Sequence, residues 1–165
     1  MLSISSSAAI WFAPFVLPVC LYVCFNDMRE LRISNATNMV LLAIFVLVGL
    51  IALPFSDYLW RYVHVAVALV VGMALYAGRA MGAGDAKFLP AAAPFIHLGD
   101  VRFLVALLAA ATLAAFLSHR VVRWTGLWKL APGWKSWNSG KRFPMGLALG
   151  GTLAIYIVLG IIYGS

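Results

Sequence analysis

Charged residues are scarce in this sequence. Charged side chains make up 10% of the 165 residues and hydrophobic ones 64%, whereas a soluble domain carries about 25% and about 45–50% respectively. A soluble fold of this length could not bury so much apolar surface. The composition therefore excludes an ordinary soluble domain and indicates that the lipid bilayer is the solvent of this chain.

Cysteine is also rare, and the two cysteines, Cys20 and Cys24, lie four residues apart in the first apolar run. They have no CxxC spacing and no second pair, so the usual pattern of a zinc site is missing. We interpret both as small apolar helix residues and expect no metal site. The N-terminal residues lack the basic region and cleavage site of a signal peptide, so we expect the first apolar run to be retained.

Long apolar runs dominate what remains. A membrane-spanning helix needs roughly 17–25 mostly apolar residues, and five runs qualify: 8–25, 36–55, 62–78, 101–117 and 145–163. A sixth run, 88–98, would cover only about half of a ~30 Å hydrocarbon core. We predict an all-α, polytopic membrane protein with about six transmembrane helices, forming a single integral-membrane domain over residues 1–165.

The distribution of basic residues supports six spans. With six, the first, third and fifth loops share one side and hold most of the lysines and arginines, while the other side keeps Arg61 and Arg102. Such a bias places the basic loops in the cytoplasm and both termini outside. A net charge of +7 can indicate nucleic-acid binding, but these residues lie between spans, so we expect no nucleic-acid partner. The basic-loop residues are Arg29, Arg32, Arg79, Lys87, Arg120, Arg123, Lys129, Lys135, Lys141 and Arg142.

Acidic residues number only five: Asp27, Glu30, Asp57, Asp85 and Asp100. We expect Asp57 and Asp100 to be solvated in outer loops near basic neighbours. Asp27 directly follows the first span, and Asp85 opens the fourth if that span begins near Met81. An ionisable residue at a membrane edge costs several kcal/mol and usually indicates function.

Asp27 and Asp85 could work as a pair. If their helices are neighbours, both carboxylates meet at one depth and can share a proton, because close like charges cannot both ionise cheaply. One carboxylate then activates water while the other polarises a peptide carbonyl, as in aspartic proteases. Two structural interpretations stay open: Asp27 as a boundary charge beside Arg29, and Asp85 as an N-cap after Gly82 and Gly84.

Three short motifs strengthen the enzymatic interpretation. Residues 82–87 (GAGDAK) resemble the GxGDxK signature of the aspartic prepilin peptidases of type IV and Flp (Tad) pilus systems. Asp27 and Arg29, followed by 33–35 (ISN), resemble the family's D-x-R-x-x-x-I-P-N motif, with Ser34 where Pro is usual. Residues 143–146 (FPMG) resemble the Pro-x-Gly element before the last helix.

The resemblance implies a function for these residues. Asp27 and Asp85 would be the catalytic pair, and no cofactor would be needed. The substrate would be a prepilin or pseudopilin with a short basic leader and a hydrophobic helix, cut at the cytoplasmic face of a bacterial or archaeal membrane. The chain lacks the cysteine-rich insertion of longer members, so the resemblance implies a peptidase without methyltransferase activity.

The neighbours of the two acids would support the site. Gly82 and Gly84 allow close backbone approach, for the substrate or an adjoining helix. Lys87 could lower the pKa of Asp85 or hold the helix end, although we favour an interface anchor. Arg29 stands beside Asp27.

Other interpretations remain for the chain as a whole. The segment 119–142 is basic and rich in tryptophan, and Leu117, Val121, Trp124 and Trp128 recur at helical spacing. This pattern suggests an amphipathic segment on the membrane surface. A small proton-coupled transporter would need polar residues deeper in several spans, which are nearly absent. A non-catalytic subunit of a pilus or secretion machine, in which the acids only hold helices together, stays open.

Overall fold

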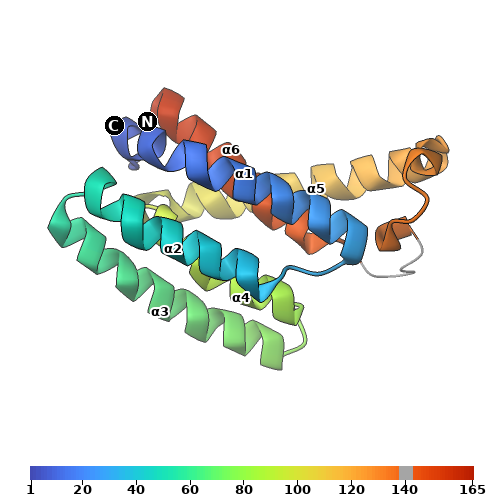
Figure 1. The fold of residues 1–165 in the computed structure, drawn as a ribbon, viewed down its shortest axis with the longest axis horizontal. Helices are drawn as coiled ribbons and strands as arrows, with labels where there is room; N and C mark the ends of the chain where they lie inside the picture. The colour runs from blue at the N-terminus through green and yellow to red at the C-terminus, as the bar shows by residue number, and fades with distance from the viewer. Residues whose placement is uncertain (138–142) are drawn as a thin grey trace.

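The computed structural model describes residues 1–137 and 143–165. In these residues the chain forms six α-helices and no strand, which confirms the predicted all-α class (Figure 1). The helices run roughly along one axis, with both termini at one end of the bundle. Their bounds are Ser6–Glu30 (α1), Asn35–Ala52 (α2), Phe55–Ala77 (α3), Ala83–Ala92 (α4), Val101–Trp124 (α5) and Met145–Tyr163 (α6).

Five of the helices in the described residues are long and apolar enough to cross a membrane, and α4 is shorter. It has ten residues and passes directly into a 3₁₀ turn at Ala93–Phe95 (η1). Pro94 explains the change, because it has no N–H to donate to the carbonyl of Pro90, four residues earlier. The fourth segment begins at Ala83 and therefore includes Asp85, as predicted. Its helix is much shorter than the other five.

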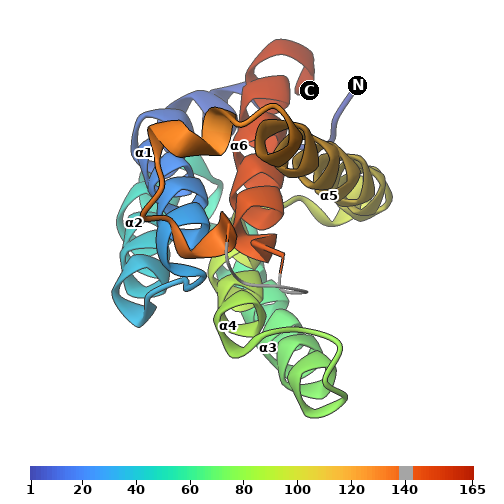
Figure 2. The same cartoon turned by 90° about the vertical axis from the view of Figure 1, so that its right-hand side faces the viewer.

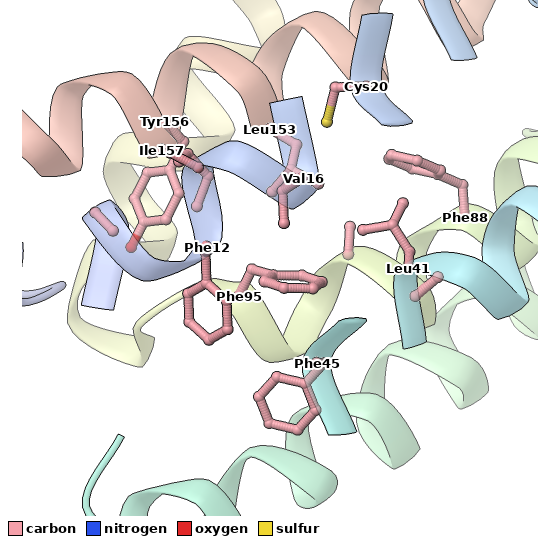
Figure 3. Close-up of a cluster of buried hydrophobic side chains, with 14 of the residues drawn as sticks. Phe12, Val16, Cys20, Leu41, Phe45, Phe88, Phe95, Leu153, Tyr156 and Ile157 are labelled. Carbon is pink, nitrogen blue, oxygen red and sulfur yellow. The ribbon is translucent and has the colours of Figure 1, made fainter. Parts of the chain in front are cut away.

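Aromatic residues anchor this short segment in the core. Phe88 on α4 and Phe95 on η1 are fully buried. Phe95 packs edge-on against Phe12 of α1 and Phe45 of α2, at ring-centroid distances of 5.0 and 5.8 Å (Figure 3). Such aromatic pairs add to the stability of simple apolar burial. These contacts anchor the fourth segment, α4 with η1, in the core.

Helix α5 stands apart from most of the bundle. It packs mainly against α6, and Ala115 is its one buried residue. Seen along the bundle, α5 lies on the far side of α6 from α1 and α2, and well away from α3 (Figure 2). Most of its apolar surface therefore faces outward, as expected of a helix surrounded by lipid.

The segment after α5 folds back onto α1. Gly126, with φ +78°, ends the helical path, so Trp128 does not continue the helix that the spacing predicted. Trp134 packs edge-on against Phe25, with ring centroids 5.6 Å apart, and Lys135 Nζ lies 2.6 Å from Glu30 Oε2. The rest of the predicted amphipathic segment, residues 138–142, lies outside the described residues.

The prediction of a solvated Asp100 is wrong. Its side chain is buried and accepts hydrogen bonds from the backbone N–H groups of Ser3 (2.7 Å) and Ile4 (3.0 Å), and from the Tyr156 hydroxyl (2.8 Å). The N-terminal residues fold over this end of the bundle and bring donors that replace water. Asp57, by contrast, is exposed as predicted.

Candidate active site

Asp27 lies in the last turns of α1 with its side chain buried. Its Oδ2 accepts a 2.6 Å hydrogen bond from the backbone N–H of Gly146. This N–H belongs to the first turn of α6, whose N-cap, Pro144, provides no side-chain cap. Asp27 therefore caps a neighbouring helix, at the end where the helix dipole favours a negative charge.

Close approach at this contact depends on a glycine. A Cβ added to Gly146 would lie 2.8 Å from Cβ and Cγ of Asp27, well inside van der Waals contact. The sequence analysis identified Gly146 as part of a motif but not as a site residue. The signal that could have found it is the Pro-Met-Gly spacing, because a glycine in the first turn of a helix lets a carboxylate approach its N–H without a Cβ in the way.

Asp85 occupies the third position of α4, not its N-cap. The N-cap is Gly82, whose backbone is extended, so the N-cap interpretation of Asp85 is wrong. The Asp85 carboxylate instead reaches back to the backbone N–H of Gly82, as the acidic residue of a capping box does. A Cβ on Gly82 would lie 3.0 Å from Asp85 Oδ2, so this glycine leaves space beside the carboxylate.

The two carboxylates come from different helices and lie at the same end of the bundle. They are near enough for the charge of Asp27 to act on Asp85. Asp85 is half-buried, whereas Asp27 is buried. Two acids in this relationship can divide one proton between them, with one ionised and the other neutral.

The GAGDAK motif packs against the loop that follows Asp27. A Cβ on Gly84 would lie 3.3 Å from the backbone nitrogen of Ile33, so α4 begins in close contact with the α1–α2 loop. Lys87 Nζ donates to Asn35 Oδ1 at 3.2 Å, at the start of α2. Ser34, where the resembling family usually has Pro, caps α2 by accepting from the Thr37 N–H. All three motifs therefore meet at one end of the bundle.

The predicted supporting cations lie at the periphery of the site. Lys87 is exposed and, within the described residues, its side chain bonds Asn35. The Arg29 side chain is 59% exposed, with Nε 3.4 Å from Glu30 Oε1. Glu30 forms ion pairs with both Arg29 and Lys135. Arg29 therefore joins the ion pairs that hold the segment after α5, one turn beyond Asp27.

Metal ligands are not grouped in the described part of the chain. No three His, Cys, Asp or Glu side chains of residues 1–137 and 143–165 lie together in a way that could hold a metal ion. Cys20 and Cys24 are free, and Cys24 Sγ lies 3.5 Å from the Leu147 carbonyl. Both cysteines pack between α1 and α6, as expected of small apolar residues.

Comparison with known proteins gives one match. The sequence profile of the type IV leader peptidase family matches residues 15–119, a region that contains Asp27, Asp85 and the GAGDAK motif. No curated protein and no solved structure matches the chain. The family match covers more than half of the chain, and the chain therefore belongs to the type IV leader peptidase family.

Proposed function

We propose that this protein is an aspartic endopeptidase that removes the basic leader from prepilin-like membrane substrates. The observation that supports the proposal is the position of Asp27 on α1 and Asp85 on α4 at the same end of the bundle. Membership in the leader peptidase family supports proteolysis. The arrangement suits water-mediated hydrolysis, because it supplies a base and an acid without a further cofactor.

The surroundings of the two acids favour different roles. Asp27 accepts the backbone N–H of Gly146 at the N-terminus of α6, a contact that favours its anion. As the base, Asp27 takes a proton from water while the water oxygen bonds the scissile carbonyl carbon. Asp85, carrying the shared proton, donates it to the carbonyl oxygen. The tetrahedral intermediate then collapses: the C–N bond breaks, the departing amine takes a proton from Asp27, and a hydroxyl of the intermediate returns a proton to Asp85.

The active-site end would face the cytoplasm. The end of α1, the α1–α2 and α3–α4 connections and the start of α4 lie opposite the two termini (Figure 1), and these segments carry Arg29, Arg32, Arg79 and Lys87. Loops rich in lysine and arginine remain on the cytoplasmic side of a membrane. We therefore place the protein in a bacterial or archaeal cytoplasmic membrane, where it would process a type IV or Flp pilin or a secretion pseudopilin.

The test is cleavage of a purified Flp-type prepilin in proteoliposomes, measured by mass spectrometry. Asp27→Asn and Asp85→Asn should each lower the rate by about 10²- to 10⁴-fold, the usual loss on removing a general base or acid. Asp57→Asn, at the exposed far end, is the control and should cleave normally.

The same experiment separates an enzyme from an assembly subunit. Asparagine keeps the oxygen that accepts the Gly146 N–H, so a carboxylate that only holds helices together would tolerate Asp27→Asn. Full cleavage by both variants would rule out the catalytic pair. Failure of the wild type on pilin and pseudopilin substrates alike would rule out the proposed substrate class.

A further inference from the structure

An apolar groove of about 570 Å³ opens between α5 and the α3–α4 pair, with α6 at its base. Figure 2 shows the spacing of these helices, with α5 set apart from α3 and α4. Rim residues such as Val67, Val71 and Val105 are exposed, so the groove is open sideways to the surroundings of the helices. Its lining is almost entirely apolar, with His64 and Thr152 as its polar members.

The groove continues the helix face that carries Asp85. Its lining on α4 and just beyond consists of residues three, four, seven, eight and eleven positions after Asp85, the spacing of one helix face. On α6, Leu149 and Leu153 lie three and seven positions after Gly146, whose N–H binds Asp27. The groove therefore starts one turn beyond both carboxylates. The lining residues of the fourth segment are Phe88, Leu89, Ala92, Ala93 and Ile96.

We infer that this groove holds the hydrophobic helix of the substrate, the segment that follows the scissile bond. The inference rests on the proposed function, because it takes the two carboxylates as the point of cleavage. A peptide bond held there requires the next residues to leave along the membrane, and the groove leads away from that point. On α3 the lining runs from Trp60 to Val71, about 17 Å of helix.

Small side chains make the groove suitable for a helix. Ala68, Ala92 and Ala93 lie along its walls, and small residues let two membrane helices approach closely. Helices α3 and α4, which form one side of the groove, pack closely together. A Cβ on Gly72 of α3 would lie 2.5 Å from the Ala86 carbonyl oxygen of α4. A helix bound there would run parallel to α4 and α6. Lipid chains are the competing occupant, and the experiment below distinguishes them.

Photocross-linking tests the occupant directly. Benzoylphenylalanine replaces Val105 in the groove or, as a matched control, Leu113 on the same helix, in the Asp85→Asn background that keeps the substrate whole. The two positions are equally exposed, at 61% and 60%, but only Val105 is among the groove residues. The probe is the prepilin that the wild type cleaves. We expect cross-links to its hydrophobic segment from position 105 and not from 113.

A second measurement uses cleavage. Ala68→Phe narrows the groove, whereas Ala66→Phe adds the same ring at an exposed position of α3 outside it. We expect Ala68→Phe to lower kcat/KM by about tenfold, which corresponds to about 1.4 kcal/mol, and Ala66→Phe to change it little.

The outcomes separate the inference from the proposed function. Equal cross-linking at 105 and 113, or cross-links to lipid alone, with wild-type cleavage intact, would overturn the groove assignment and leave the peptidase standing. Cleavage unaffected by Ala68→Phe would do the same. Loss of the proposed function would show instead as Asp27→Asn and Asp85→Asn variants that still cleave.

Discussion

Gly146 N–H and Asp27 Oδ2 are joined by a 2.6 Å hydrogen bond across 119 positions of the sequence. This bond connects the last turns of α1 to the first turn of α6. It also places a buried carboxylate where the unpaired N–H groups of a helix end favour its anion. The site is thus built on the most extensive helix pair in the described bundle, α1 with α6.

Gly146→Ala should displace Asp27 and reduce catalysis. The added Cβ would meet Asp27 at 2.8 Å, so helix or carboxylate must move by a substantial fraction of an ångström. A misplacement of about 1 Å can cost about 10²-fold in rate. The measurement is kcat on the prepilin in proteoliposomes. Gly151→Ala, on the same helix with open space around its Cβ, is the control, and equal rates for the two variants would contradict the prediction.

Gly72→Ala should destabilise the contact between α3 and α4. A Cβ there would lie 2.5 Å from the backbone oxygen of Ala86, which cannot move aside as a flexible side chain can. We expect a net loss of about 1–3 kcal/mol, even after the roughly 1 kcal/mol that alanine gains over glycine in a helix. Thermal unfolding in detergent measures it. A variant as stable as the wild type would show that the two helices separate easily.

Asp100→Asn should lower stability without changing the chemistry. The buried carboxylate accepts three hydrogen bonds that tie the N-terminus to α6, and hydrogen bonds to a charged group contribute about 1.5–3 kcal/mol each. We expect a lower Tm but an unchanged kcat for the folded fraction, because Asp100 lies at the opposite end from Asp27. Asp57→Asn should leave the Tm unchanged. A lost kcat at normal Tm would place Asp100 in the mechanism instead.

Lys87→Gln should retain most of the activity. Lys87 is exposed and bonds Asn35, and exposed polar contacts contribute about 0–1 kcal/mol. We expect kcat/KM to fall by less than about fivefold, since 1 kcal/mol corresponds to that factor. The pH–rate profile of the variant should match that of the wild type. A displaced profile would show that the cation tunes Asp85 after all.

Much of this protein could be predicted from its sequence. The scarcity of charge and the long apolar runs require helices in lipid, because a backbone in hydrocarbon must satisfy its own hydrogen bonds. The spacing of Asp27, the GAGDAK motif and the Pro-x-Gly element indicated the family and the pair of acids. Each of these signals is local or depends on composition, so it can be recognised without knowledge of the fold.

Only the tertiary structure decided which groups meet. The rotation of each helix about its axis placed Asp27 against Gly146, and the fold of the N-terminal residues buried Asp100, which the sequence analysis expected in water. The groove beside α5 likewise depends on where α5 leaves α6. Apolar faces that look alike in sequence can pack against protein or lipid at nearly equal cost, because lipid is as apolar as leucine. The hydrophobic pattern of the sequence determined where the helices form, and the packing of those helices determined which residues make up the site.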